Sequence, residues 1–121
     1  MVAAARARGV VAHVADLHEL DLGRRFDKIL CAGPLEFCAS PGRVLRRLSE
    51  HLRPGGRLVV LFPPPTLVGR LYALHHRSHG LRIQLYSIRD VGAWLRAADL
   101  APDEVLRPGP FTAVMRARSP A

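Results

Sequence analysis

The pattern of apolar and polar residues is clearest between residues 26 and 61, where it predicts two strands joined by a helix. The run Phe26–Ala32 is apolar except for Asp27 and Lys28, which is typical of a strand in a parallel sheet. A second apolar run, Arg57–Phe62, predicts another strand. Strands connected through a helix are parallel neighbours with a right-handed crossover, so this stretch is predicted to be one βαβ unit.

The connecting helix is predicted from its start signal and its apolar stripe. Ser40 suits the N-cap, and Pro41 suits the first helical position, where its missing N–H costs no hydrogen bond. The stripe consists of apolar residues at helical spacing, Val44, Leu45, Leu48 and Leu52. Pro54 and the two glycines after it predict the end of the helix.

The rest of the chain follows the same alternation of helix and strand. The further predicted elements are a helix over Met1–Arg8 with Gly9 as its C-cap, a strand over Val10–Val14, a helix after Thr66, a strand over Leu81–Tyr86, a helix over Ile88–Ala98 capped by Ser87, a turn over Ala101–Glu104, a strand starting at Val105 and a strand over Phe111–Arg116. A length of 121 residues fits one domain, so residues 1–121 are predicted to form a single α/β domain.

Three short motifs in the central unit occur in an order that points to a known family. They are Phe26-Asp27 in the strand, Leu35-Glu36-Phe37 in the loop and the segment Leu52–Leu58, which reads L-R-P-G-G-R-L. With this spacing the chain resembles the second half of a class I S-adenosylmethionine-dependent methyltransferase of the type 11/12-like group. The resemblance implies a partial Rossmann-like methyltransferase sheet, mostly parallel with an antiparallel C-terminal strand, and helices on both faces.

The resemblance also implies cofactor-binding residues. Asp16 and Leu17 match the family's adenine contact, in which the carboxylate accepts from the exocyclic amine. Asp16 follows a predicted strand, and open α/β sheets bind ligands beyond the carboxyl ends of their strands. A turn-capping role for Asp16 stays open beside this one. In the family the loop after residue 30 borders the cofactor, and the residues at those positions are Cys31, Ala32, Gly33 and Glu36.

Residues near the methyl acceptor are predicted less sharply. The resemblance places Phe37 beside the acceptor pocket, where many members have a histidine, so no catalytic residue is assigned. His75 and His76 are candidates for the same pocket, with a solvated helix end as the alternative. An alternative interpretation of Leu35 and Phe37 is that they fill the core. His75 and His79 are four residues apart, but no third ligand is nearby, so no metal site is predicted.

One family motif has no counterpart in the sequence. There is no G-x-G turn, which in the family lets the backbone approach the methionyl part of the cofactor. The resemblance therefore covers the C-terminal two thirds of the fold and implies an N-terminally truncated domain. Two absent strands would leave Phe26–Ala32 as an open sheet edge. Three outcomes follow: the Val10–Val14 strand closes the gap beside Lys28, two copies pair as a homodimer, or an N-terminal complementing chain binds this edge.

Composition narrows the class of protein. The formal net charge is +8, but all basic residues except Lys28 are Arg, which is typical of a biased genome composition. No basic run is interleaved with stacking aromatics, so nucleic-acid binding is the less favoured interpretation. Cys31 and Cys38 fit neither a zinc site nor a redox pair and predict reduced thiols in the cytoplasm. The longest apolar run, Leu58–Val68, contains three prolines and predicts no membrane span.

Three function hypotheses follow from these observations. The first is a portion of a methyltransferase that uses S-adenosylmethionine and a small-molecule methyl acceptor, inactive as an isolated chain. The second is a non-catalytic methyltransferase-like partner subunit, and the third is an Arg-rich nucleic-acid-binding domain. The sequence does not identify the acceptor, because the residues after Pro65 that would shape its pocket follow no recognisable pattern.

Overall fold

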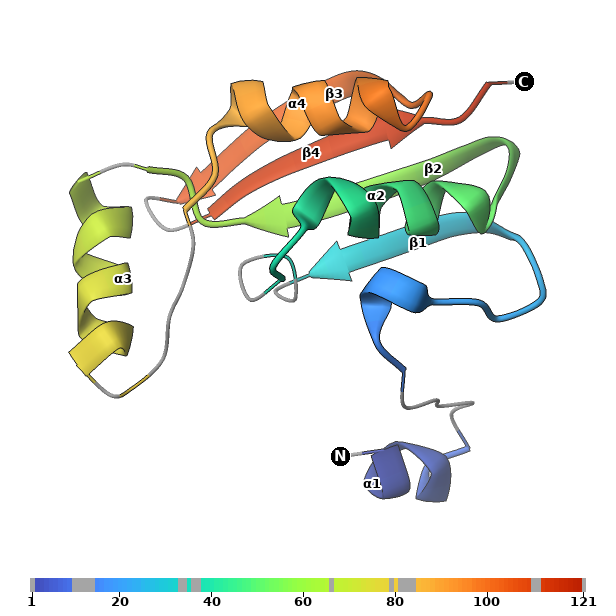
Figure 1. The fold of residues 1–121 in the computed structure, drawn as a ribbon, viewed down its shortest axis with the longest axis horizontal. Helices are drawn as coiled ribbons and strands as arrows, with labels where there is room; N and C mark the ends of the chain where they lie inside the picture. The colour runs from blue at the N-terminus through green and yellow to red at the C-terminus, as the bar shows by residue number, and fades with distance from the viewer. Residues whose placement is uncertain are drawn as a thin grey trace.

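A computed structural model describes residues 2–9, 15–32, 35, 38–65, 67–78, 80, 85–109 and 112–120. The described strands are β1 (Phe26–Ala32), β2 (Leu52–Phe62), β3 (Ala101–Gly109) and β4 (Thr112–Arg118). They form one sheet in the order β1-β2-β4-β3, in which β1 and β2 are parallel and β4 is antiparallel to both of its neighbours (Figure 1). Three strands therefore run in one direction and the last runs against them, which confirms the predicted sheet.

Two helices pack on one face of this sheet. The described helices are α1 (Val2–Ala7), the short 3-10 helix η1 (Leu17–Glu19), α2 (Pro41–Glu50), α3 (Leu67–Ser78) and α4 (Ile88–Ala97). Figure 1 shows α2 and α4 side by side over the strands, and Arg46 donates a hydrogen bond from Nη2 to the Ala97 carbonyl oxygen at 2.8 Å. We call the side of the sheet under α2 and α4 the covered face.

The core lies between this covered face and the two helices. Burial alternates along β2 from Gly56 onwards and along β4, because successive strand residues point to opposite faces. The buried strand residues include Leu58, Val60, Phe62, Ala113, Met115 and Ala117, and the buried helix residues facing them include Val44, Leu45, Val91 and Leu95. Each fully buried Leu or Val contributes roughly 1.5–3 kcal/mol, so this layer is the main source of stability.

The boundary between α2 and β2 differs from the prediction. The helix ends at Glu50, and β2 begins already at Leu52, which pairs with Phe26 of β1. Arg53 precedes a proline, and the proline ring disfavours the helical conformation at that position. Gly55 then adopts a φ of +75° and its N–H donates to the carbonyl oxygen of Pro120 at 2.9 Å, which ties the turn to the C-terminal segment.

The start of β3 also differs. Residues 101–104 were predicted as a turn but belong to the strand, whose register with β4 shifts between Pro102 and Glu104. Arg116 of β4 holds this irregular part, with Nε 2.9 Å from Asp103 and Nη1 3.2 Å from Glu104. The strand predicted over Val10–Val14 and residues 81–84 of the strand predicted over Leu81–Tyr86 lie outside the described residues.

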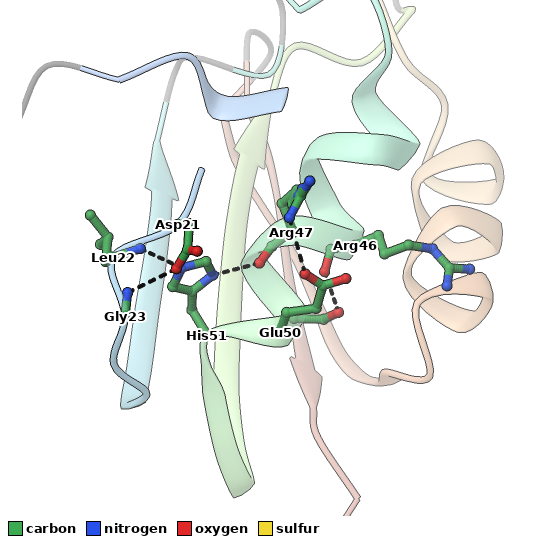
Figure 2. A network of polar contacts seen from close by, with 8 residues as sticks. Asp21, Leu22, Gly23, Arg46, Arg47, Glu50 and His51 are labelled. Atoms are coloured by element: carbon green, nitrogen blue, oxygen red, sulfur yellow. Dashed lines mark hydrogen bonds and ion pairs between the residues drawn. The ribbon is translucent and has the colours of Figure 1, made fainter. Parts of the chain in front are cut away.

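A buried histidine connects the segment before β1 to the end of α2 (Figure 2). The N–H of Leu22 donates to Nε2 of His51 at 3.0 Å, and Nδ1 of His51 is 2.7 Å from the carbonyl oxygen of Arg47. Phe26 donates its N–H to the His51 carbonyl oxygen at 2.7 Å. Since Nε2 accepts a hydrogen bond, the proton lies on Nδ1 and the ring is neutral. His51 thus fastens the segment that leads from η1 into β1.

Candidate functional site

Asp16 is held in a fixed position near the start of α2. Its Oδ1 accepts from the backbone N–H of His18 at 2.9 Å and lies 2.9 Å from Nδ1 of the same residue. The N–H of Ser40, just before α2, donates to Nε2 of His18 at 3.1 Å. The His18 ring therefore carries its proton on Nδ1 and bridges Asp16 to the N-terminus of α2. This chain of contacts fixes the direction of the carboxylate.

The second oxygen of Asp16 is available to a ligand. The side chain is 63% exposed, and Oδ2 accepts no hydrogen bond from the part of the chain that the structure describes. The backbone hydrogen bond from His18, followed by its side-chain hydrogen bond, lowers the pKa of Asp16 below the ordinary value of 3.8. Because Leu17 packs half-buried against the core, the neighbouring Asp16 stays at the surface. The predicted turn-capping role is also observed, since Asp16 is the N-cap of η1.

Two buried thiols and a buried phenol, of Cys31, Cys38 and Tyr86, lie near one another, and Cys38 lies close enough to Asp16 to be affected by its charge. Burial, and secondly Cys38, raises the pKa of the Cys31 thiol to about 11, and burial, and secondly Cys38, raises the pKa of Tyr86 to about 12. Tyr86 donates its hydroxyl hydrogen to the carbonyl oxygen of Cys38 at 3.4 Å. The pKa of Cys38 is raised by burial and then by the charge of Asp16, which places these groups together. A thiol or phenol with a raised pKa is protonated at neutral pH, so none of them is an activated nucleophile.

The other predicted site residues are placed as follows. Ala32 is exposed at the carboxyl end of β1, and Cys31 beside it is buried, as is Leu35, which confirms the core-filling role for Leu35. Gly33, Glu36 and Phe37 lie outside the described residues, as does the side chain of His76. His75 is exposed on α3, which Figure 1 shows beyond the carboxyl ends of β1 and β2.

Sequence reasoning missed His18, Cys38 and Tyr86 as parts of this site. His18 lies in a polar loop, and only the fold shows that it contacts Ser40, which is 22 positions away. Tyr86 reaches Cys38 across 48 positions, and its ring packs edge-on against Trp94 with the centroids 5.2 Å apart. The one sequence signal for these residues was Tyr86 itself, a polar aromatic residue directly before Ser87, the predicted helix cap.

A cavity lies beyond the carboxyl end of β2. It has a volume of about 380 Å³ and is lined by Pro64, Pro65, Ser87, Ile88, Arg89, Arg107 and Thr112. Cavities of this size hold small organic molecules. The described residues contain no group of three or more His, Cys, Asp or Glu side chains that could hold a metal ion.

The sequence matches one family model. Residues 1–60 match the model of a methyltransferase domain. Residues 1–60 belong to the methyltransferase domain family. The matched segment ends inside β2, and it contains Asp16 and the loop after β1. The fold shows that the methyltransferase resemblance extends through the remaining helices and strands.

Solved structures share the methyltransferase fold. A S-adenosylmethionine-dependent methyltransferase from Thermotoga maritima, a possible histamine N-methyltransferase, superposes with a TM-score of 0.76 at 20% identity over 98% of this chain and 69% of its own. The 1,6-didemethyltoxoflavin-N1-methyltransferase of Burkholderia thailandensis, solved with that molecule and S-adenosylhomocysteine, has a TM-score of 0.75 at 24% identity over 98% and 56%. An O-methyltransferase family 2 protein from Planctomyces limnophilus in complex with apigenin has 0.74 at 22% identity over 88% and 34%.

The chain is shorter than these proteins. It spans from about a third to about two thirds of the three structures. No curated protein sequence matches it significantly. In the described part of the chain, no helix is long and apolar enough to cross a membrane.

Proposed function

We propose that this chain supplies the carboxyl-terminal part of a S-adenosylmethionine-dependent methyltransferase that acts on a small molecule. The position of Asp16 carries the proposal. Its Oδ1 is occupied by His18, and the other oxygen of this exposed carboxylate accepts no hydrogen bond from the described residues and can serve as an ionised acceptor. An acceptor of this kind fits the exocyclic amine of adenine, with Leu17 providing an apolar contact beside it.

The residues fit only one end of the cofactor. Asp16 and Leu17 suit the adenine, and the exposed Ala32 at the end of β1, with Cys31, Gly33 and Glu36, would border the middle of the molecule. No G-x-G turn in the sequence suits the methionyl end. We therefore expect the isolated chain to bind the whole cofactor weakly and to have little activity.

When bound, S-adenosylmethionine supplies a sulfonium-linked methyl group that an acceptor takes by in-line attack. Such a transfer depends mainly on positioning, so it needs no ionised thiol or phenol from this chain. Phe37, His75 and His76 are retained in this proposal as contacts of the acceptor. Among the described cavities, the one beyond β2, which is lined by Ser87 and Arg107 among others, best resembles an acceptor pocket. Cys31 and Cys38 are buried and not in a disulfide, which fits a cytoplasmic location.

The Asp16 assignment predicts that adenosine binds the isolated chain and that one substitution weakens it. Asp16→Asn keeps an oxygen for His18 but replaces the ionised acceptor, so the affinity is expected to fall by roughly 10- to 100-fold, as for a lost charged hydrogen bond of roughly 1.5–3 kcal/mol. The measurement is an NMR titration that follows the amides of Leu17 and Ala32. Asp99→Asn is the control, because Asp99 is exposed and its φ of +62° suits asparagine.

Two results would contradict the proposal in different ways. Unchanged amide shifts on addition of adenosine would remove Asp16 as the adenine contact. Calorimetric titration with S-adenosylmethionine that gives a Kd well below about 1 mM, an affinity of about −4.1 kcal/mol, would show that the isolated chain holds the cofactor without a glycine-rich turn.

The position of β1 favours a second candidate function. Among the described strands β1 ends the sheet, so its outer backbone groups can pair with another strand. We infer from this edge that the chain can act as a non-catalytic partner subunit, either in a homodimer or with an N-terminal complementing chain. A partner at this edge is compatible with the methyltransferase proposal, since it would stand next to the candidate cofactor residues of β1.

A further inference from the structure

The cavity beyond β2 is enclosed by segments that are far apart in the sequence. Its wall combines the prolines that follow β2, the first residues of α4 and the adjacent ends of β3 and β4. The N–H of Tyr86 donates to the carbonyl oxygen of Pro63 at 3.2 Å, which holds the start of α4 against the end of β2. The shape of the cavity therefore depends on tertiary contacts and not on one loop.

The charged side chains in this wall are two arginines. Arg89 lies in the first turn of α4 and Arg107 near the end of β3, so the two cations come from different elements. Neither forms an ion pair with a described residue. Cations that line the same cleft repel each other and attract an anion into it. The cavity beyond β2 therefore favours a negatively charged ligand.

Two other cavities of the described structure show that this charge pattern is particular to the one beyond β2. Arginine is frequent in the chain and lines all three. Asp21 and Glu50, however, line the cavity beside His51, and Asp103 and Glu104 line the cavity between α4 and β3. The described wall of the cavity beyond β2 contains cations without a carboxylate.

The nearest carboxylates do not neutralise Arg89. Its side chain also lines the cavity that contains Asp103 and Glu104. Arg116 holds both of these carboxylates, with Nε 2.9 Å from Asp103 and Nη1 3.2 Å from Glu104. Asp90, the next residue in sequence, is exposed and lies outside the wall of the cavity beyond β2. The charge of Arg89 is therefore left for a ligand.

The rest of the wall suits an apolar molecule with a few polar atoms. Pro64, Pro65 and Ile88 provide rigid apolar contacts. The hydroxyl oxygen of Ser87 accepts a backbone hydrogen bond from α4, which leaves its hydrogen to donate, and the half-buried Thr112 supplies a second hydroxyl donor. A volume of about 380 Å³ is enough for a small organic molecule.

The cavity lies at the same edge of the sheet as the candidate cofactor residues. Ala32, the last residue of β1, pairs with Leu61 near the end of β2, so the two parallel strands end together. Pro64 follows the end of β2 and lines the cavity. A molecule bound there would stand beyond the carboxyl ends of both strands, where open α/β sheets hold their ligands.

We propose that the cavity beyond β2 binds the anionic group of a small apolar molecule, a carboxylate or a phosphate ester, and that this molecule is the methyl acceptor. Arg89 and Arg107 would hold the anionic oxygens, because a planar guanidinium forms paired hydrogen bonds with either group. The prolines and Ile88 would pack against the apolar part. The acceptor role rests on the proposed methyltransferase function, whereas binding of the anion rests on the cavity alone.

The test is an NMR titration of the full chain with matched small probes. Benzoate and phenyl phosphate carry the two anionic groups, and benzamide is the uncharged counterpart of benzoate. The anions are expected to shift the amides of Ile88 and Thr112 and to bind at least about tenfold more tightly than benzamide, as for a hydrogen bond to a charged group. The tighter of the two anions identifies the preferred group. Inorganic phosphate should bind more weakly than phenyl phosphate, because it lacks the apolar part.

Variants connect the binding to the two arginines. Arg89→Gln and Arg107→Gln should each weaken binding of the anions, and the double variant should bind benzoate no better than benzamide. Arg96→Gln is the matched control, because Arg96 is exposed on the same helix and lines the cavity between α4 and β3 instead. It should leave binding unchanged, and circular dichroism checks that all variants are folded.

Several outcomes would overturn the anion site. They are equal binding of the anions and benzamide, anion binding that persists in the double variant, and inorganic phosphate that binds as tightly as phenyl phosphate. Adenosine, followed at the amides of Leu17 and Ala32, separates this inference from the proposed function. Binding of adenosine without the anions would leave the Asp16 assignment and remove the anion site. Binding of the anions without adenosine would support the anion site and overturn the acceptor role.

Discussion

At the scale of single residues, His51 does the most to hold the segment that carries the candidate site. It is 6% exposed, and its ring and carbonyl oxygen together bond to Leu22, Arg47 and Phe26. Asp16 lies at the far end of the same segment and is tied down there by His18. The orientation of Asp16 therefore rests on two histidines, one at each end of the connection between η1 and β1.

We predict that His51→Ala destabilises the protein by about 2–4 kcal/mol, because it leaves the Leu22 N–H without its acceptor and opens space in a buried position. Chemical denaturation followed by circular dichroism measures the change. Glu19→Ala, an exposed substitution in the same segment, is the control and should change the free energy of unfolding by less than about 0.5 kcal/mol. An equal effect of both variants would show that His51 has no special role in holding this segment.

At the scale of elements, the turn between α2 and β2 contains two glycines that are required for different reasons. Gly55 has a φ of +75° with open space around it, so only its backbone conformation favours glycine. Gly56 is buried, and a Cβ there would lie 2.8 Å from the carbonyl oxygen of Arg53 and 3.1 Å from that of Asp27. Backbone atoms of two strands cannot move aside as a flexible side chain can.

Gly56→Ala is therefore expected to cost about 1–3 kcal/mol and to loosen the pairing of β1 with β2. Gly55→Asn is the matched variant next to it and should cost only about a few tenths of a kcal/mol, because asparagine tolerates a positive φ. Thermal unfolding followed by circular dichroism compares the two. A Gly56→Ala protein as stable as Gly55→Asn would mean that the β1 backbone is not held against this turn as described.

The same elements show how far local sequence rules reach. Ser87 was predicted to cap α4, and its hydroxyl accepts from the Asp90 N–H at 3.0 Å, because both partners lie within one turn. Ser40 was predicted to cap α2 in the same way, but its side chain makes no capping hydrogen bond, and its own N–H is bound by His18. A contact from a distant loop thus changed the role of the residue, and no local pattern contains that information.

In the candidate site, too, local sequence rules locate some residues and miss those that depend on distant contacts. Ala32 was located correctly at the carboxyl end of β1, whereas the strand predicted before Asp16 lies outside the described residues, so its place at a strand end stays a prediction. Cys38 and Tyr86 could not be located, because the pairing of their polar groups depends on how α4 lies over the sheet. The parallel β1–β2 unit was predicted correctly, whereas the early start of β3 at Ala101 was not, since prolines and acidic residues there are typical of turns.

At the scale of the whole molecule, the described sheet has an open edge at β1. The order β1-β2-β4-β3 leaves the apolar strand β1 at the end of the described sheet, and apolar edges of this kind pair readily with other strands. The high positive charge opposes the approach of two copies. The balance between these two effects depends on salt, because screening weakens the repulsion between exposed charges but leaves backbone hydrogen bonds almost unchanged.

We predict that the chain self-associates through β1 and that the association strengthens as salt is added. Sedimentation velocity over a series of concentrations and salt levels measures it.

Successive N–H groups of a strand point to opposite sides, so one of Ile29→Pro and Leu30→Pro removes a hydrogen bond to β2, while the other removes only a donor at the edge. The variant that stays folded should remain monomeric where the parent chain associates. Leu30→Ala keeps every backbone donor and separates an effect of the backbone edge from an effect of the exposed Leu30 side chain. A well-folded monomer at all concentrations and salt levels would contradict the prediction, and the β1 edge would then not be a site for pairing between copies.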